Sequence, residues 1–274
     1  MIGFHLAAQD NAMNLTQDTT RQLAEHLETA ELNREPVRKI TDTHPEMDWE
    51  DAYAIQDAIR ARKQARGTRI AGLKMGLTSF AKMRQMGVTD PVYGFLTDYG
   101  ACMDGGAIDT ASLIHPKVEA EIAFVLKHPL KGPGCHIGDV LAATDFVLPA
   151  VEVIDSRYEN FRFDLKSVIA DNTSSARFVV GGTHRSAEGI DLKNLGVVLE
   201  KNGEVVATAA GAAVLGHPAS SVAMLANMLG ARGRELPAGT FIMTGGVTEA
   251  IAVAAGDSIT VRYQHLGTVS MRFV

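Results

Sequence analysis

Cysteine is scarce in this sequence: Cys102 and Cys135 stand far apart, and neither belongs to a C-x-x-C pair. The chain therefore shows neither a disulfide framework nor a zinc ribbon, and both residues are expected to be reduced thiols in a cytoplasmic protein. Long apolar runs are also missing, since none reaches the ~18 residues that a membrane helix needs. Residues 1–14 lack the charged start and apolar centre of a signal peptide, and we expect them to form a disordered leader.

Several nucleotide-binding and hydrolytic motifs are absent as well. The chain has no G-x-x-x-x-G-K-[ST], no G-x-G-x-x-G after a strand, no G-x-S-x-G and no H-E-x-x-H. These absences argue against nucleotide-dependent, α/β-hydrolase and zincin mechanisms. The formal net charge of −6 gives no global attraction to nucleic acid or to anionic lipid, so an anionic substrate would need a local cation or a metal ion.

The pattern of apolar residues divides the 274-residue chain into a helical N-terminal part and a strand-rich remainder. Residues 16–34 are predicted to form an amphipathic helix capped by Thr16 or Asp18, and a second helix is predicted from Asp48 to a stop at Gly67. From Thr68 onward, short strands alternate with glycine turns. We therefore expect an N-terminal helical region over 15–67 and a catalytic β-rich domain over 68–274.

Acidic residues interrupt two apolar runs that are otherwise typical of buried strands. Between Val118 and Leu126 nearly every residue is apolar except Glu119 and Glu121, and because side chains alternate along a strand, the two carboxylates point the same way. Glu152 repeats the anomaly in a second predicted strand, 145–154.

Buried carboxylates need compensation. Ionised carboxylates brought together away from water repel one another, and each costs roughly several kcal/mol in desolvation unless a cation or a proton compensates. Convergence of Glu119, Glu121 and Glu152 would suit a hard divalent ion such as Mg²⁺ or Mn²⁺. The alternative is that Glu119 and Glu121 line a solvated edge and that Glu152 pairs with Lys117 or Arg157.

Lys74 lies inside the first predicted strand, 69–77, between Leu73 and Met75. A lysine is uncommon there unless its ammonium has a partner. One interpretation is an edge lysine that guards against strand pairing. The other is a cation that faces the acidic site and is ready to hold a substrate carboxylate or to polarise a carbonyl.

Small polar residues follow two other apolar segments. The stretch 168–175 ends in Asn172-Thr-Ser-Ser175, whose side chains could cap a turn or donate hydrogen bonds to a substrate carboxylate. The predicted strand 240–246 ends in a glycine turn, where Thr244 and exposed backbone amides could meet an anion.

Three further local patterns have structural interpretations. A short helix over 78–86 is predicted to be capped by Thr78 or Ser79. Asn202-Gly203, between two alternating runs, predicts a type I′ hairpin. His217 precedes a predicted helix over 220–229 and is interpreted as a loop histidine, because no second histidine stands at ligand spacing.

Five motifs carry a resemblance to a known family. Residues 16–274 resemble the 2-oxo-3-hexenedioate (4-oxalocrotonate) decarboxylases of bacterial aromatic meta-cleavage pathways. These enzymes are relatives of the 2-hydroxypenta-2,4-dienoate hydratases in the fumarylacetoacetate hydrolase superfamily. The motifs are Gly72-Leu-Lys-Met-Gly-Leu-Thr78, His115-Pro-Lys-Val-Glu-Ala-Glu-Ile122, Val151-Glu-Val-Ile-Asp-Ser-Arg-Tyr-Glu-Asn-Phe161, Ala170-Asp-Asn-Thr-Ser-Ser175 and Ile242-Met-Thr-Gly-Gly246.

The resemblance implies an α+β fold, a mixed β-roll or barrel of the fumarylacetoacetate hydrolase type behind an N-terminal helical region. It implies a Mg²⁺ or Mn²⁺ site made by Glu119, Glu121 and Glu152, with Lys74 beside the substrate and Ser174 near it. It also implies metal-dependent decarboxylation of a 2-oxo diacid, a homo-oligomer, and a complex with the partner hydratase.

One position bears on the choice between decarboxylase and hydratase. The hydratase pattern has an aspartate straight after the proline of the 87–94 loop, where this chain has Val92. Addition of water to a C=C bond needs a group that moves protons, which valine cannot do. The run with Asp155 and Tyr158 is also closer to the decarboxylase pattern. The decarboxylase is therefore expected; the alternatives are a hydratase and a non-catalytic scaffold subunit.

Overall fold

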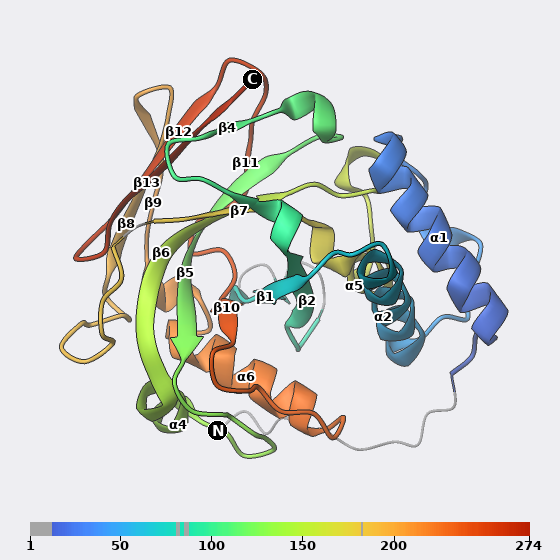
Figure 1. Ribbon diagram of the computed structural model, residues 1–274, viewed down its shortest axis with the longest axis horizontal. Helices are drawn as coiled ribbons and strands as arrows, with labels where there is room; N and C mark the ends of the chain where they lie inside the picture. The colour runs from blue at the N-terminus through green and yellow to red at the C-terminus, as the bar shows by residue number, and fades with distance from the viewer. Residues whose placement is uncertain (1–12, 81–82, 85–87, 182) are drawn as a thin grey trace.

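The computed structural model describes residues 13–274 except 81–82, 85–87 and 182. Most of the predicted leader and part of the predicted 78–86 helix lie outside the described residues. A helical lobe packs beside two β-sheets, and the long strands β5 and β6 run through the middle of the protein (Figure 1). The predicted α+β class is therefore confirmed. The division at 67/68 stays a prediction, and the link between the second helix and the first strand spans residues 66–69.

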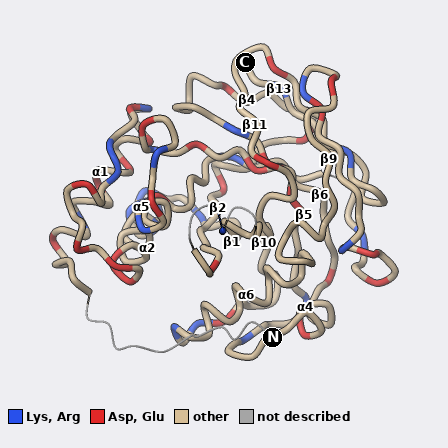
Figure 2. Tube along the Cα trace, turned by 180° about the vertical axis from the view of Figure 1, so that it is seen from behind, with Lys and Arg blue, Asp and Glu red and all other residues tan. Residues whose placement is uncertain are grey.

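The helical lobe forms where the capping residues predict it. Helix α1 (Gln17–Asn33) begins after Thr16, whose side chain accepts a hydrogen bond from the Thr19 amide, and α2 (Trp49–Ala65) begins with a capping box between Asp48 and Asp51. Acidic and basic residues are interspersed along both helices (Figure 2).

Ion pairs join the two helices of the lobe. Arg62 and Arg66 of α2 both donate hydrogen bonds to the carboxylate of Glu28, which is 1% exposed on α1. Helix α2 in turn packs against α5 (Leu165–Ala170), which attaches the lobe to the strands.

Within the described residues, the larger sheet has eight strands and is mixed. Strands β1 and β10 pair in parallel, as do β3 and β7, whereas β5 pairs antiparallel with both β10 and β6. The spatial order is β2 (Val92–Thr97), β1 (Ile70–Gly76), β10 (Phe241–Met243), β5 (Lys117–Leu126), β6 (Thr144–Ile154), β7 (Ser175–Val180) and β3 (Ala101–Cys102), with β11 (Ile251–Ala252) paired to the start of β5.

The smaller sheet covers one side of β6 and β7. Its order is β4 (Ala107–Ile108), β13 (Gly267–Phe273), β12 (Ser258–Tyr263), β8 (Gly196–Lys201) and β9 (Glu204–Ala210). The predicted hairpin is confirmed, because Asn202 and Gly203 connect β8 to β9 with φ of 56° and 83°, the positive values that a type I′ turn requires. Aliphatic side chains of both sheets form one continuous core.

Two helices lie against the larger sheet at the end opposite the C-terminus (Figure 1). They are α4 (Ile137–Ala143) and α6 (Pro218–Gly230), and α6 also packs on β1. His217 is the N-cap of α6, because its Nδ1 accepts a hydrogen bond from the Ala219 amide, so its role is more specific than that of a loop histidine.

One segment of the described chain, Gly211–Gly230, is long and apolar enough to cross a membrane by composition alone. Half of its most apolar window is buried inside the protein, as in a core helix. The segment does not stand out in the sequence as a long apolar run, because polar residues such as Ser220 and Asn227 interrupt it.

Candidate active site

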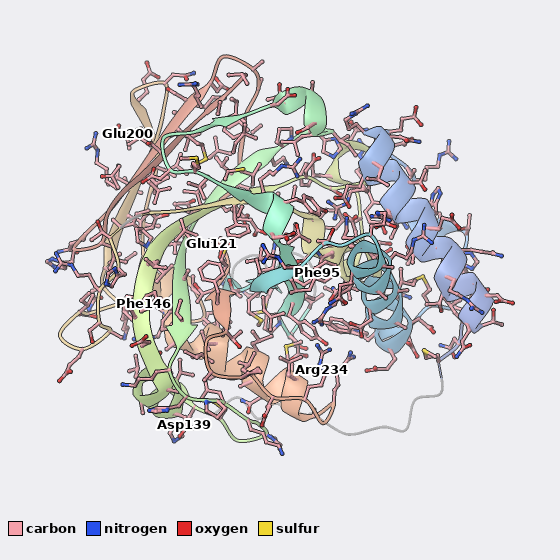
Figure 3. All side chains as sticks on the ribbon, in the orientation of Figure 1. Phe95, Glu121, Asp139, Phe146, Glu200 and Arg234 are labelled. Carbon is pink, nitrogen blue, oxygen red and sulfur yellow. The ribbon has the colours of Figure 1, made fainter. Side chains whose placement is uncertain are left out.

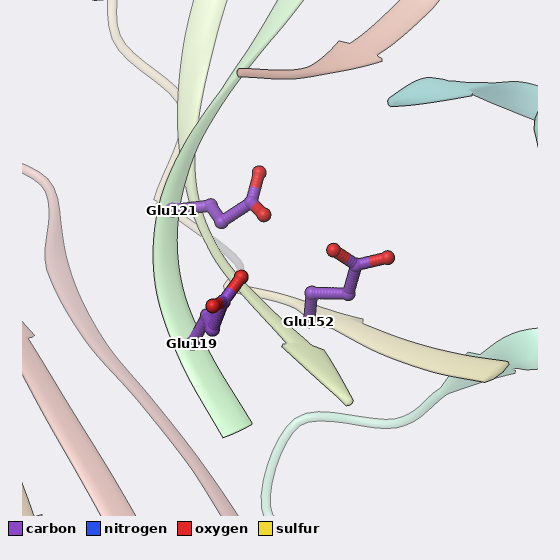
Figure 4. Close-up of side chains that lie close together, drawn as sticks. All are labelled: Glu119, Glu121 and Glu152. Atoms are coloured by element: carbon purple, nitrogen blue, oxygen red, sulfur yellow. The ribbon is translucent and has the colours of Figure 1, made fainter. Parts of the chain in front are cut away.

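The pairing of β5 with β6 brings the three glutamates together. Glu119 lies directly opposite Glu152 in the antiparallel register, and Glu121 follows two residues later on the same face of β5. One carboxylate oxygen from each residue lies within 4.8 Å of the others, and the three side chains point toward a common centre (Figure 4). Like charges placed opposite each other on a sheet are unfavourable, so this arrangement calls for a compensating cation.

Burial of the three glutamates makes a compensating cation more necessary. Glu121 and Glu152 are fully buried, Glu119 is 9% exposed, and Figure 3 places Glu121 in the interior of the protein. Burial, and then the charge of Glu152, raises the pKa of Glu121 well above its usual range. Burial likewise raises the pKa of Glu152, although the nearby Lys74 ammonium opposes that shift. Within the described residues, the Oε1 atoms of Glu121 and Glu152 accept no hydrogen bond.

The donor set fits a hard divalent ion. The three oxygens lie within 4.8 Å of one another, so modest movements of the side chains would bring all of them within coordination distance of one ion. Carboxylate oxygens are the ligands that Mg²⁺ and Mn²⁺ prefer, and the orphaned oxygens of Glu121 and Glu152 are available for coordination. Glu121 is held in position by the Gly245 amide, which donates to its Oε2 at 2.7 Å.

Lys74 lies beside this cluster. Its Nζ is 2.6 Å from Glu152 Oε2, donates to the Thr173 carbonyl oxygen at 3.1 Å, and belongs to a side chain that is only 2% exposed. The edge-strand interpretation is wrong, because β1 lies between β2 and β10 inside the sheet. The alternative prediction that Glu152 pairs with Lys117 or Arg157 is wrong as well, because its ion pair is with Lys74.

Residues 172–174 form a left-handed turn that presents groups to Lys74. The φ angles of Asn172, Thr173 and Ser174 are 47°, 53° and 59°, a conformation that costs L-residues roughly 1–2 kcal/mol each. The Asn172 side chain holds the turn on β2, because its Nδ2 donates to the Phe95 carbonyl and its Oδ1 accepts from the Phe95 amide, both at 2.9 Å. Gly94 permits the close approach, since a Cβ there would lie 2.6 Å from the Thr173 hydroxyl oxygen.

The Thr173 carbonyl of this turn contacts Lys74, and Ser174 is the next residue along the chain. The Ser174 hydroxyl is buried and has no hydrogen-bond partner within the described residues, so it can still donate to a bound molecule. From the sequence, Ser174 was expected near the substrate, whereas a role for the Thr173 carbonyl was not. A run of small polar residues after an apolar segment does not specify a left-handed backbone.

Arg157 binds the residues on both sides of this turn, Asp171 and Ser175. Its guanidinium pairs with the Asp171 carboxylate and donates to the carbonyl oxygens of Asp155, Asp171 and Ser175. Burial raises the pKa of Asp171 to about 6, although the ion pair with Arg157 opposes this shift. This role cannot be read from the sequence, because Arg157 and Asp171 come into contact only in the folded chain.

Thr244 is buried at the end of β10, and its hydroxyl donates to the Ile122 carbonyl at 2.7 Å. The hydroxyl hydrogen is therefore already used in the sheet, and the adjacent Gly245 amide is used by Glu121. The structure gives both groups a role in supporting the acidic cluster, whereas contact of Thr244 with substrate stays a prediction.

An open cleft of about 500 Å³ leads to Glu119, a volume within the usual range of ligand sites. Its walls are formed by residues 76–79 after β1 and 246–250 after β10, with Lys117 and Ala213 completing the lining. The cluster of three glutamates thus opens to solvent on the side of Glu119, as a site that exchanges a small molecule requires.

Three comparisons connect this geometry to known proteins. A model of the fumarylacetoacetate (FAA) hydrolase C-terminal family matches residues 89–274. The chain is 65% identical to the 4-oxalocrotonate decarboxylase of Pseudomonas sp. (strain CF600), over 95% of this chain and 98% of that protein. It is 41% identical to the 2-hydroxyhexa-2,4-dienoate hydratase of Comamonas testosteroni, over 85% of this chain and 89% of the hydratase.

A solved structure agrees with these relationships. The fold superposes with a TM-score of 0.94 on the 4-oxalocrotonate decarboxylase from Pseudomonas putida G7, complexed with magnesium and adipate, at 63% identity over 96% of this chain and 100% of that chain. The resemblance inferred from the five motifs is confirmed. The chain belongs to the fumarylacetoacetate hydrolase family, in the group formed by the 4-oxalocrotonate decarboxylases and the related dienoate hydratases.

Proposed function

We propose that this chain is a cytoplasmic, metal-dependent decarboxylase that converts 2-oxo-3-hexenedioate to 2-hydroxypenta-2,4-dienoate and CO₂ during meta-cleavage catabolism of aromatic compounds. The observation that carries the proposal is the buried cluster of Glu119, Glu121 and Glu152 with Lys74 beside it. The 65% identity to a 4-oxalocrotonate decarboxylase supports the choice of substrate.

Glu119, Glu121 and Glu152 would hold Mg²⁺ or Mn²⁺, and the magnesium in the Pseudomonas putida G7 relative supports that choice. When bound, the ion supplies a Lewis acid that draws electron density toward the 2-oxo group of the substrate. The three glutamates would supply its carboxylate ligands, and Glu121 and Glu152 are fully buried.

Lys74 carries the second positive charge of the site. Its Nζ forms an ion pair with Glu152 Oε2 and donates a hydrogen bond to the Thr173 carbonyl, and an ammonium has three hydrogens, so a donor would remain for the substrate. Fixed in this way, Lys74 stabilises negative charge that develops on the C2 oxygen without having to reorient during the reaction. The partner-free Ser174 hydroxyl would orient the substrate carboxylate next to that oxygen.

The electron balance explains why such a site suffices. The C5–C6 bond breaks and CO₂ leaves, the freed pair forms C4=C5, the C3=C4 pair moves to C2=C3, and the C2 oxygen takes the negative charge. Protonation of that oxygen gives 2-hydroxypenta-2,4-dienoate. The residues need only position the diacid and stabilise an oxyanion, and no Schiff base with Lys74 is required.

The direct test mixes purified protein, Mg²⁺ and 2-oxo-3-hexenedioate and measures CO₂. Glu152→Gln and Glu119→Gln are expected to abolish metal-dependent release with the circular dichroism spectrum unchanged. Lys74→Ala is expected to lower kcat/KM by about 10²–10³-fold, as the loss of one charge-stabilising donor does in other enzymes. Full activity of EDTA-treated Glu152→Gln protein would refute the metal assignment, and an unchanged Lys74→Ala would leave that lysine with a structural role.

The second candidate is a dienoate hydratase, which the 41% identity to the Comamonas testosteroni enzyme favours. Val92 argues against it, because this side chain is 1% exposed at the start of β2 and cannot exchange protons with water. Water addition to 2-hydroxypenta-2,4-dienoate by the wild-type chain would support the hydratase. A gain of that activity in Val92→Asp would show that this position controls the choice.

We also propose that the chain forms a homo-oligomer and associates with the hydratase that consumes its product. The relationship to dienoate hydratases supports a shared mode of assembly. Light scattering, which measures the molar mass of the particles in solution, tests both proposals. The chain alone should have the mass of an oligomer, and its mixture with the hydratase should have the mass of a complex. Activity of the isolated, metal-loaded chain would exclude a purely scaffolding role.

A further inference from the structure

Lys117 opens strand β5 and shares a face with the acidic cluster. Side chains at 117, 119 and 121 point the same way, and the Cα of Lys117 precedes that of Glu119 by about 7 Å along the strand. Lys117 lines the 500 Å³ cleft together with Glu119, and it is the one Lys or Arg among the described residues of that lining.

In the part of the chain that the structure describes, the Lys117 ammonium has no carboxylate partner. No ion pair joins it to any described acidic residue, including Glu249 at the rim of the cleft, although the side chain is half-buried. Its Nζ instead lies 4.0 Å from the centre of the Phe161 ring, a contact that stabilises a cation without neutralising it. A partly desolvated charge held in this way beside a cleft is suited to an anion that arrives from solution.

We propose that Lys117 binds the substrate carboxylate that lies farther from the metal, and that it makes the site selective for dicarboxylates over monocarboxylates. This inference rests on the proposed function, because it takes the metal-binding end of the substrate to lie at Glu119, Glu121 and Glu152. The Cα atoms of Lys117 and Glu119 are about 7 Å apart along β5, a separation similar to that of the two carboxylates in an extended six-carbon diacid.

The bound carboxylate is the group that leaves as CO₂, which determines how Lys117 acts on the reaction. An ion pair with Lys117 stabilises the intact substrate, whereas in the transition state that negative charge is moving toward the C2 oxygen and Lys74. Lys117 therefore contributes to substrate binding and not to the rate of the bond-breaking step. Its removal is expected to raise KM and to leave kcat unchanged or higher, which is the opposite of the result expected for Lys74.

Calorimetric binding of adipate and hexanoate to the Mg²⁺-loaded protein tests the inference without turnover. The two probes have the same chain length and differ in the second carboxylate. Wild-type protein should bind adipate about 10- to 100-fold more tightly than hexanoate, and Lys117→Met should bring that ratio close to one by weakening adipate alone. Lys117→Arg should keep the preference, and Lys193→Met, which removes an exposed lysine outside the cleft, should match the wild type.

Phe161→Leu provides a second variant that keeps the charge and removes the ring beneath it. It should weaken adipate several-fold and leave hexanoate unchanged. An adipate preference that is unaltered in both Lys117→Met and Phe161→Leu would overturn the inference, as would a loss of kcat with KM unchanged in Lys117→Met. Failure of the wild type to release CO₂, with adipate still bound through Lys117, would overturn the proposed reaction and leave the carboxylate site in place.

Discussion

The left-handed turn at 172–174 should respond sharply to the loss of one side chain. Asn172→Ala removes both hydrogen bonds that connect the turn to the backbone of Phe95 and leaves a buried N–H and a buried C=O without their partner. It also places alanine at φ of 47°, a conformation that asparagine tolerates better. The carbonyl of Thr173, which accepts from Lys74, is the next group along the turn.

The magnitude follows from these contacts. Each unpaired backbone group costs about 1–2 kcal/mol, and the left-handed conformation adds about 1 kcal/mol for alanine, so Asn172→Ala should lower the free energy of unfolding by about 3–5 kcal/mol. Because Lys74 then loses its hydrogen bond to the Thr173 carbonyl and keeps only the ion pair with Glu152, kcat should fall by at least about tenfold, which corresponds to 1.4 kcal/mol. KM should change less, because the glutamates are untouched.

Urea unfolding and steady-state CO₂ release measure the two effects separately. Asn194→Ala is the matched control, since it removes an exposed asparagine that donates only to Asp191 and should change the unfolding free energy by less than about 0.5 kcal/mol. An Asn172→Ala protein as stable as this control would refute the hydrogen-bond argument. A destabilised protein with wild-type kcat at a temperature where it is folded would show that Lys74 does not depend on the turn.

Two further substitutions test the supports of the site and the helical lobe. Gly94→Ala should destabilise the protein and reduce kcat, because the new Cβ would collide with Thr173 and Asn172; wild-type stability by thermal unfolding would contradict this. Burial raises the pKa of Glu28, but the hydrogen bonds from Arg66 and Arg62 together have the larger effect and hold this pKa below 4.5. The Glu28 carboxylate therefore stabilises the folded protein above pH ~4.5, and this stabilisation is lost as the pH falls further. In Glu28→Gln the free energy of unfolding at pH 7 should be about 1–3 kcal/mol lower than in the wild type, and in urea titrations it should depend less on pH in the acid range. The same dependence of the unfolding free energy on pH in both proteins would exclude the ion-pair explanation.

The sequence was sufficient to predict the acidic strands and their burial. Glu119 and Glu121 interrupt an apolar run at a spacing of two, so their common face follows from strand geometry alone. Their convergence with Glu152 required a pairing register, which the sequence indicated only through the family resemblance. The register exists because the apolar faces of β5 and β6 must both be buried, and a shift by one residue would invert every side chain.

The surroundings of Lys74 were much less accessible to sequence analysis. Lys74 was compatible with an edge strand until β10, from the far end of the chain, was found beside β1. The left-handed conformation of Thr173 is imposed by Asn172 and Arg157 through tertiary contacts, whereas local propensity would disfavour it. Lys117 entered the sequence analysis only as a possible partner for Glu152, because the Phe161 ring that holds it is distant in the sequence.

The site draws on segments that are far apart in the chain, from Lys74 on β1 to the Gly245 amide after β10. During synthesis on the ribosome, the glutamates of β5 and β6 emerge long before that amide, and β1 emerges even earlier relative to its parallel neighbour β10. A nascent chain therefore cannot present a finished ion site until most of its synthesis is over. Prematurely terminated products should be inactive, and metal loading should be one of the last events in the maturation of the enzyme.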